Sequence, residues 1–310
     1  MAKPCIGIVY GYQHSRWIGH KTGELFALLK AQFEARGIDV QKVGVMDLKV
    51  EVIGGQLTIT DLHSGRDMAE LGGLYFANWR IGPEFAMGLA QLMLRAGKPI
   101  VSEEVARVMP MGKLGEAILL SDKNLPVIDS VFMRNKYWLK LLAKGQPLPF
   151  AFPFILKSAH GTMGMHNHLV KDASQLTDIL SEDLKRLFVA QPFIPNDGDW
   201  RIIVIGGKVR FAMIRRRAAD ATTHVNNTSQ GGTGTLVDLK DFPPALNDLA
   251  LKAAAAVGRS SFAGVDIVEH KDNGKLFVLE INKTPQMETG ANTYEKVTAL
   301  VDYFAETFEG

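Results

Sequence analysis

Phe262-Ala-Gly-Val-Asp266-Ile-Val-Glu269 and Leu276-Phe-Val-Leu-Glu280-Ile-Asn282-Lys-Thr-Pro285 are the two segments that decide how this chain is interpreted. Both are rich in the apolar and β-branched residues of strands, and the turn signal between them predicts a β-hairpin. Glu280 and Asn282 are two residues apart and share one face of a strand, which Asp266 on the neighbouring strand can also reach. Two carboxylates and an amide oxygen suit Mg²⁺ that carries substrate phosphates. A half-exposed hairpin with a solvated polar face is the alternative.

Composition sets broad limits on the function. The chain has 310 residues, of which 46% are hydrophobic and 22% charged, which is typical of a globular protein with two or three domains. A net charge of +2 does not indicate a nucleic-acid partner. Cys5 is the only cysteine, and neither a signal sequence nor an apolar run of membrane-spanning length is recognisable. We therefore expect a cytoplasmic protein without a membrane partner.

Residues 1–110 predict an N-terminal α/β domain. Strands alternate with helical patterns, as in residues 5–10 and 22–36, and this alternation indicates a doubly wound parallel sheet. Such sheets bind ligands beyond the carboxyl ends of their strands. Arg80 follows one strand at such an end, where it could hold a substrate carboxylate. A surface arginine stacked on Trp79 is the alternative.

A lysine and a glycine-containing loop suggest a phosphate site further along the chain. Residues 111–150 are interpreted as a linker and helical segment. Lys157 then ends a strand and precedes a loop with Gly161 and Gly164. A lysine supplies charge, and glycines allow backbone N–H groups to approach phosphate oxygens. A glycine hairpin with a solvated lysine is the competing interpretation.

A hairpin over residues 200–217 ends in three arginines. Strand alternation places Arg215 and Arg217 on one face and Arg216 on the other, and solubilising charge at a sheet edge is the alternative to a functional role. Before this hairpin, the strand that ends at Gln191 to Ile194 offers apolar side chains and free backbone groups to an adenine.

The order of these motifs resembles the ATP-grasp ligases. It is most similar to the RimK-like branch, which includes the ribosomal-protein glutamate ligase, with glutathione synthetase a more distant relative. The similarity covers residues 130–310 by motif and residues 1–110 by topology alone. It implies an α/β protein, α+β in its C-terminal part, in which the N-terminal domain (1–110) and linker (111–150) precede two ATP-grasp subdomains (151–195 and 196–310).

The resemblance implies roles for individual residues. The nucleotide would be held by residues that match its lysines, its covering loop and its adenine segment: Lys136, Lys157, Gly161, Gly164, Gln191, Phe193 and Ile194. Arg201 and Arg215 match basic residues beside the transferred phosphoryl group. Arg80, Arg217 and Asn227 are the expected substrate contacts, and Asp266, Glu280 and Asn282 match the metal ligands. The segment between Lys136 and Lys157 is shorter than is usual in the family.

The activity implied is ATP-dependent joining of a carboxylate to an amine, with Mg²⁺ as cofactor and Mn²⁺ as an alternative ion. The chemistry would pass through an acyl phosphate and needs charge neutralisation rather than an enzyme nucleophile. The substrates would be a small-molecule or peptide carboxylate and an amine, and relatives often form homo-oligomers. The alternatives are a phosphotransferase on the same fold and a nucleotide-binding module without turnover.

Overall fold

The N-terminal sheet is parallel and has the strand order β2-β1-β5-β6. The computed structural model describes residues 3–11, 13, 20–53, 56–79, 82–106, 112–159, 166–184, 186–217, 226, 232–287 and 291–309. The four strands are β1 (Cys5–Tyr10), β2 (Asp39–Gly44), β5 (Gly73–Phe76) and β6 (Ile100–Val101). β1 and β5 are almost wholly buried because helices cover both faces of a doubly wound sheet. The predicted parallel α/β arrangement is confirmed.

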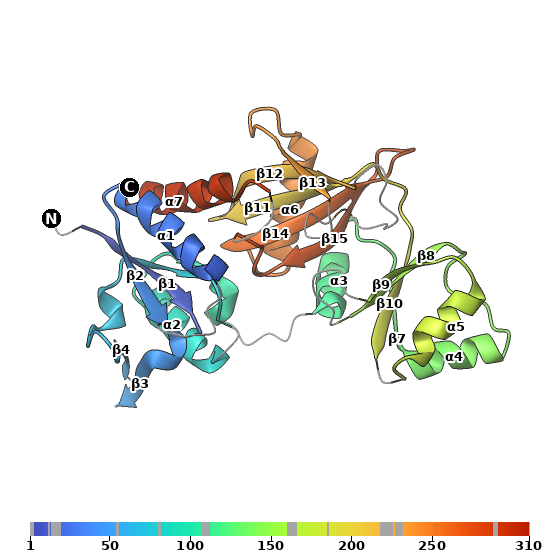
Figure 1. The fold of residues 1–310 in the computed structure, drawn as a ribbon, viewed down its shortest axis with the longest axis horizontal. Helices are drawn as coiled ribbons and strands as arrows, with labels where there is room; N and C mark the ends of the chain where they lie inside the picture. The colour runs from blue at the N-terminus through green and yellow to red at the C-terminus, as the bar shows by residue number, and fades with distance from the viewer. Residues whose placement is uncertain are drawn as a thin grey trace.

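Helices from both ends of the chain pack around this sheet. They are α1 (His20–Glu34), α2 (Pro83–Arg95) and the C-terminal α7 (Thr293–Glu309). α7 lies beside α1 (Figure 1), and the rings of Phe33 and Phe304 meet edge to face at 5.7 Å. Short 3₁₀ turns and one antiparallel hairpin complete this region: η1 (Val45–Asp47), β3 (Leu48–Ile53), β4 (Gln56–Asp61), η2 (Met68–Glu70) and η3 (Glu103–Ala106). The end of the chain is thereby joined to its beginning.

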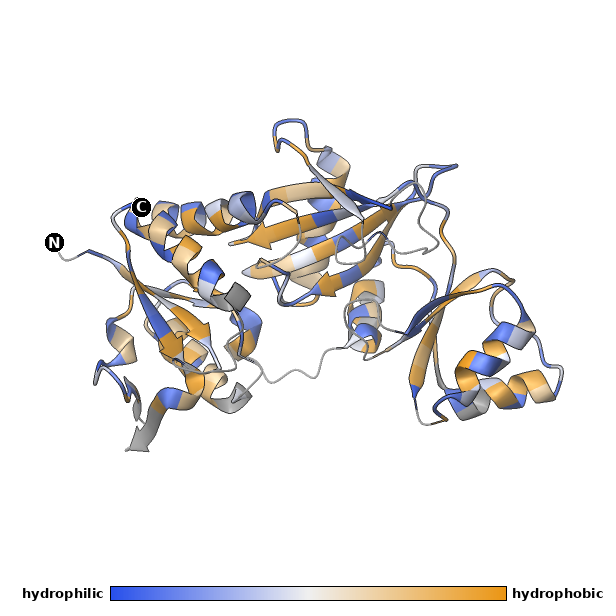
Figure 2. Cartoon of the chain, in the orientation of Figure 1, coloured by the Kyte–Doolittle hydropathy of each residue, from blue (hydrophilic) through white to orange (hydrophobic). Residues whose placement is uncertain are grey.

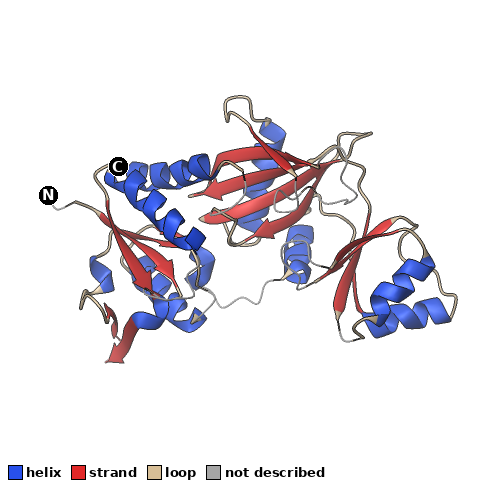
Figure 3. Cartoon of the chain, in the orientation of Figure 1, coloured by secondary structure: helices blue, strands red, loops and turns tan. Residues whose placement is uncertain are grey.

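A second, smaller sheet has the order β7-β10-β8-β9 and is antiparallel. Its elements are β7 (Val131–Arg134), α4 (Asn135–Ala143), β8 (Phe154–Ser158), β9 (Asn167–Val170), α5 (Ala173–Ser181) and β10 (Leu187–Pro192). Figure 3 shows both helices on one side of this sheet. Phe154 and Leu156 are fully buried against Trp138 of α4, so Lys157 points from the opposite face of β8.

The central sheet has five strands in the order β13-β12-β11-β14-β15. Its elements are α3 (Lys113–Asp122), β11 (Asp199–Ile205), β12 (Lys208–Arg216), β13 (Thr233–Leu236), α6 (Pro244–Ala256), β14 (Phe262–Glu269) and β15 (Leu276–Asn282). Ile202 and Val204 pack with α6, whereas Ile203 and Ile205 pack with α7 on the other face. Figure 2 shows the apolar strands between these helices.

The predicted hairpins of the central sheet are confirmed, and the expected linker has more structure than the sequence indicated. β14 pairs with β15, and β11 pairs with β12. Residues 111–150 contain α3 and also β7, which pairs with β10 of the small sheet. The domain boundaries at 110, 150 and 195 stay predictions. Among the described helices, none has the length and apolar character needed to cross a bilayer.

Candidate active site

The β14–β15 hairpin brings the predicted metal ligands together through a bulge. Asp266 lies opposite Glu280, and Gly264 lies opposite Asn282, but the next pair is Ile267 with Val278. Leu279 is therefore the extra residue of a β-bulge. Because of it, Val278 packs on the α6 side of the sheet while Glu280 keeps the face of Asp266. The two-residue spacing predicts that Glu280 and Asn282 share a face, and the bulge determines which face it is.

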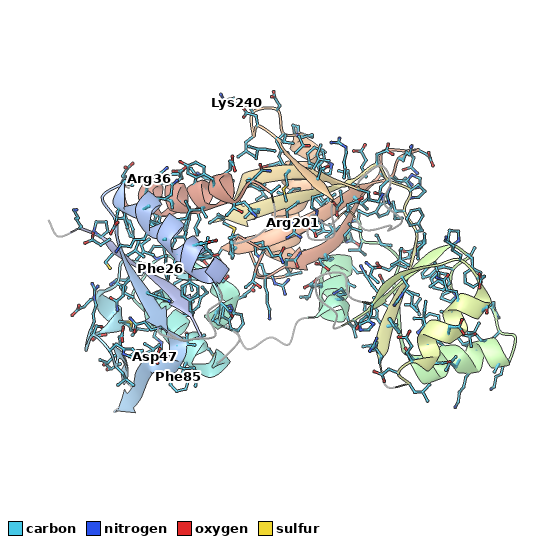
Figure 4. All side chains as sticks on the ribbon, viewed as in Figure 1. Phe26, Arg36, Asp47, Phe85, Arg201 and Lys240 are labelled. Carbon is cyan, nitrogen blue, oxygen red and sulfur yellow. The ribbon has the colours of Figure 1, made fainter. Side chains whose placement is uncertain are left out.

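Two arginines converge on Asp266. Arg201 is its partner in the β11–β14 register, and the Arg201 Nε lies 2.7 Å from Oδ1 of Asp266. An Nη atom of Arg215 lies 3.0 Å from Oδ2 of the same carboxylate, and Arg215 also binds both oxygens of Asp199, at 2.9 and 2.6 Å. Figure 4 shows the labelled Arg201 at the central sheet. The arrangement is a buried network of alternating charges.

The protonation of Asp266 reflects a competition between burial and these cations. Burial raises the pKa of Asp266 to about 6, against the lowering effect of Arg201 and Arg215. The nearby carboxylates of Asp199 and Glu280 act in the same direction as burial. Asp266 therefore ionises readily only when positive charge compensates its poor hydration.

Glu280 has a different electrostatic environment. Burial disfavours its charge, but Lys113 and Lys157 outweigh that effect and lower the pKa of Glu280. The Lys113 Nζ lies 3.7 Å from a Glu280 carboxylate oxygen. Burial in turn lowers the pKa of Lys157, and Glu280 opposes that shift. The Glu280 carboxylate therefore interacts with two lysines, Lys113 from α3 and Lys157 from β8.

These lysines lie at a pocket between the small sheet, α3 and β15. Its charged and polar lining residues include Lys113, Glu116, Lys157, Gln191 and Glu280. Its apolar lining residues include Leu120, Ile128, Phe132, Val189 and Leu279. Val189 and Gln191 alternate with Phe188 and Ala190, which face α4 and α5. Gln191 Nε2 donates to the Ser130 hydroxyl at 2.7 Å. An apolar lining that ends in lysines has the chemical character expected for binding a purine joined to phosphates.

The carboxyl end of the N-terminal sheet reaches this site from another direction. Trp79 follows β5, and the Lys283 ammonium lies 5.1 Å from the centre of its ring. Lys283 comes directly after Asn282. The segment predicted to hold a substrate carboxylate is therefore next to the strand predicted to hold the metal.

Comparison with known protein families identifies the family to which this chain belongs. The model of the RimK-like ATP-grasp domain matches residues 117–301. The chain belongs to the RimK-like ATP-grasp family. This confirms the resemblance inferred from the order of its motifs. ATP-grasp ligases use ATP, and the RimK-like chain is an ATP-dependent carboxylate–amine ligase.

Individual relatives support the same class. The RimK-like chain is 27% identical to a probable alpha-L-glutamate ligase of Psychromonas ingrahamii, over 90% of this chain and 89% of the relative. It is 29% identical to the tetrahydromethanopterin:alpha-L-glutamate ligase of Methanosarcina acetivorans, over 66% of this chain and 68% of the relative. The ATP-grasp ligase PsnB, solved with a precursor peptide and AMPPNP, superposes with a TM-score of 0.68 at 15% identity, covering 99% and 97% of the two chains. PsnB was also solved with a minimal precursor, Mg and ADP, with a TM-score of 0.67, 16% identity and 97% and 96% coverage.

Some of the predicted site residues meet at the pocket, some lie beside it, and others are outside the described residues. Lys157, Gln191 and Glu280 line the pocket, while Arg201 and Arg215 meet Asp266 beside it. Phe193 and Ile194 follow β10, and Arg217 donates to the Asn196 carbonyl at 2.8 Å. Lys136 lies in α4, and its side chain is outside the described part of the chain. The remaining predicted residues also lie outside the described residues: Arg80, Gly161, Gly164 and Asn227.

Sequence reasoning missed Lys113 and Glu116, which line the pocket from α3. Both lie in the segment interpreted as a linker. Their spacing of three residues places them on one helical face, and this was the available signal. It was weak because many exposed helices carry the same pair.

Proposed function

We propose that this chain uses ATP to join an acidic amino acid, with L-glutamate as the first candidate, to the carboxylate of a peptide or small-molecule acceptor. The observation that carries the proposal is the meeting of Lys113, Lys157 and Glu280 at the apolar pocket. Relatives named alpha-L-glutamate ligases support glutamate as the amine. The precursor peptide bound by PsnB makes a peptide one acceptor to test.

The reaction needs an activated carboxylate because a free carboxylate is a poor electrophile. An acceptor oxygen attacks the γ-phosphorus, and the bond from that phosphorus to ADP breaks, giving an acyl phosphate. The amine then forms the C–N bond and loses a proton, while the bond from the acyl carbon to phosphate breaks. Arg201 and Arg215 lie where they would hold the negative charge that moves between these groups.

The oxygen-bearing residues of β14 and β15 fit a magnesium site. Asp266, Glu280 and Asn282 supply hard oxygen ligands without sulfur or imidazole. Lys113, Lys157 and a hydrogen bond from the Asn282 side chain already hold Glu280 toward its charged form, in which it can bind a cation. When bound, Mg²⁺ would neutralise the β- and γ-phosphate oxygens. Mn²⁺ as a substitute and self-association of the chain stay predictions.

We assign the first nucleotide lysine to Lys113 rather than to Lys136. Lys113 lines the pocket beside Glu280, whereas residue 136 lies in the first turn of α4. In this assignment, Lys113 and Lys157 approach the phosphates from α3 and from β8. Gln191 and the apolar residues near it hold the base.

The test measures ADP release from Mg-ATP with glutamate and a panel of peptide and small-molecule carboxylates. The proposal expects release that requires both substrates and yields an amide with one added glutamate by mass. A stable phosphorylated product formed without an amine would establish the phosphotransferase instead. Nucleotide binding without ADP release across the panel would contradict the proposed substrates. Glu280→Gln is the inactive control and should remain folded, with a cooperative unfolding transition.

A further inference from the structure

Arg259 is a buried arginine that joins three separate segments of the chain. It lies between α6 and β14, and the residue is 2% exposed. Its Nε lies 3.0 Å from a Glu104 carboxylate oxygen, and its Nη1 lies 2.7 Å from a Glu116 carboxylate oxygen. Nη1 also donates to the backbone carbonyl of Ile281. Such a buried cation is stable only where several acceptors compensate its lost hydration.

The contact with Ile281 links this cluster to the proposed metal site. Ile281 lies between Glu280 and Asn282 in β15, the edge strand of the central sheet. Its backbone N–H points to the second oxygen of Glu116 at 3.4 Å, while its carbonyl accepts from Arg259. The pair of Arg259 and Glu116 therefore engages both backbone groups of the residue that separates the two ligands.

The cluster is also attached to the N-terminal part of the chain. Glu104 belongs to η3, and the neighbouring Glu103 N–H donates to the Ser261 hydroxyl at 2.5 Å. Ser261 is two residues after Arg259. Arg259 is thus held from the N-terminal side by Glu104 and from the pocket side by Glu116.

The geometry points to Arg259 as a positioning residue for the nucleotide–metal site, acting by fixing the Ile281 peptide and with it the Glu280 and Asn282 side chains. The inference rests on the proposed function, in which those side chains hold magnesium. A bulge in β15 precedes Glu280, and the described contacts on the outer edge of the strand include a short bridge from Val278 to Val127, before the bulge. After the bulge, Arg259 and Glu116 supply the contacts that fix the strand at Ile281.

The experiment compares AMPPNP binding with and without Mg²⁺ in the full chain by titration calorimetry. The ratio of the two dissociation constants defines the magnesium coupling. Arg259→Met should reduce this coupling about 10- to 100-fold, the usual effect of removing a residue that orients a ligand. Affinity for metal-free AMPPNP should stay within a factor of about two, because Arg259 does not line the pocket. Arg259→Lys, which keeps the charge, should lie between Arg259→Met and the wild type.

Arg210→Met is the matched control. Arg210 is also poorly exposed and binds both oxygens of Glu306, at 2.8 and 2.7 Å, but this pair joins β12 to α7 and does not include β15. Its loss should lower stability without altering magnesium coupling. A folded Arg259→Met variant with wild-type coupling overturns the inference.

Two further outcomes separate the possible failures. If Arg259→Met does not fold, Arg259→Gln replaces it, because glutamine keeps a hydrogen-bond donor on a shorter, uncharged side chain. Unchanged coupling in folded Arg259→Gln overturns the inference. If the wild-type chain itself shows no magnesium coupling, the proposed function fails and the inference falls with it. Coupling that is present in the wild type and lost in Glu280→Gln supports the proposed function independently of Arg259.

Discussion

Arg201 and Asp266 face each other across β11 and β14, and two nitrogens of the arginine lie 2.7 and 3.1 Å from the two carboxylate oxygens. Arg215 adds a third contact, at 3.0 Å. A carboxylate predicted to bind a metal is therefore also the common partner of two arginines.

Asp266→Asn should destabilise the fold as well as weaken magnesium binding. The substitution leaves Arg201 and the 4% exposed Arg215 with less compensation, and breaking such a buried pair costs about 3 kcal/mol, less the relief of removing a carboxylate whose charge burial disfavours. Urea unfolding measures this cost. Glu269→Gln, at the exposed end of the same strand, is the control and should change the free energy of unfolding by less than about 0.5 kcal/mol. Equal stability of the two variants would show that the arginines do not depend on Asp266.

Glu104 should make stability fall as the pH rises from about 4.5 to about 7. Burial raises the pKa of Glu104 to about 7 from its ordinary value of 4.5, against the opposing charges of Arg259 and Lys283. Within this window the folded chain keeps a proton that the unfolded chain has lost, so stabilisation present at low pH disappears as the pH rises. The change is at most about 3 kcal/mol.

Unfolding free energies of the wild type and Glu104→Gln at pH 5 to 8 test this prediction. The difference between the two proteins should shift in favour of the variant as the pH rises, because glutamine does not titrate. Glu103→Gln changes the neighbouring charge but keeps the pair of Glu104 and Arg259, so it should retain the wild-type slope. Parallel curves for the wild type and Glu104→Gln would contradict the prediction.

Lys113→Met and Lys157→Met should each weaken AMPPNP binding about 10- to 100-fold, since each removes a charged hydrogen-bond donor from the phosphate end of the pocket. Calorimetric titration measures the effect. Lys123→Met and Lys171→Met change exposed lysines near the same elements and are the controls. Lys136→Met decides between the two assignments of the first nucleotide lysine. A loss of affinity in Lys136→Met without one in Lys113→Met would restore the assignment made from the motif order.

Gly264→Ala should disturb the turn that follows β15. Gly264 lies opposite Asn282, and a Cβ atom there would lie 2.6 Å from the Pro285 Cβ and 3.1 Å from an Arg201 nitrogen. Relieving this overlap should cost about 1–3 kcal/mol and reduce magnesium coupling. Thermal unfolding and AMPPNP titration measure both effects. Gly23→Ala, in α1 with no atom within 4 Å of its added Cβ, should instead stabilise the chain slightly.

Local patterns were enough to predict the elements that carry the site. The apolar alternation around Asp266 and Glu280 predicts two strands and a turn, and the structure has β14 and β15 at these positions. Lys157 was also found from the sequence, because it lies at the end of a short apolar strand and precedes a loop with two glycines. These features depend on neighbours in sequence.

Hydrophobic periodicity and residue chemistry are local properties, so the parallel N-terminal sheet, the β14–β15 hairpin and its oxygen-bearing side chains were predictable from the sequence. The contact of Lys113 with Glu280 could not be predicted from local patterns, because it joins segments far apart in the chain. The Leu279 bulge and the clamp of Arg259 on Ile281 were likewise decided by the tertiary structure. A buried charge gains its stability from partners that folding brings together, and no local spacing specifies those partners.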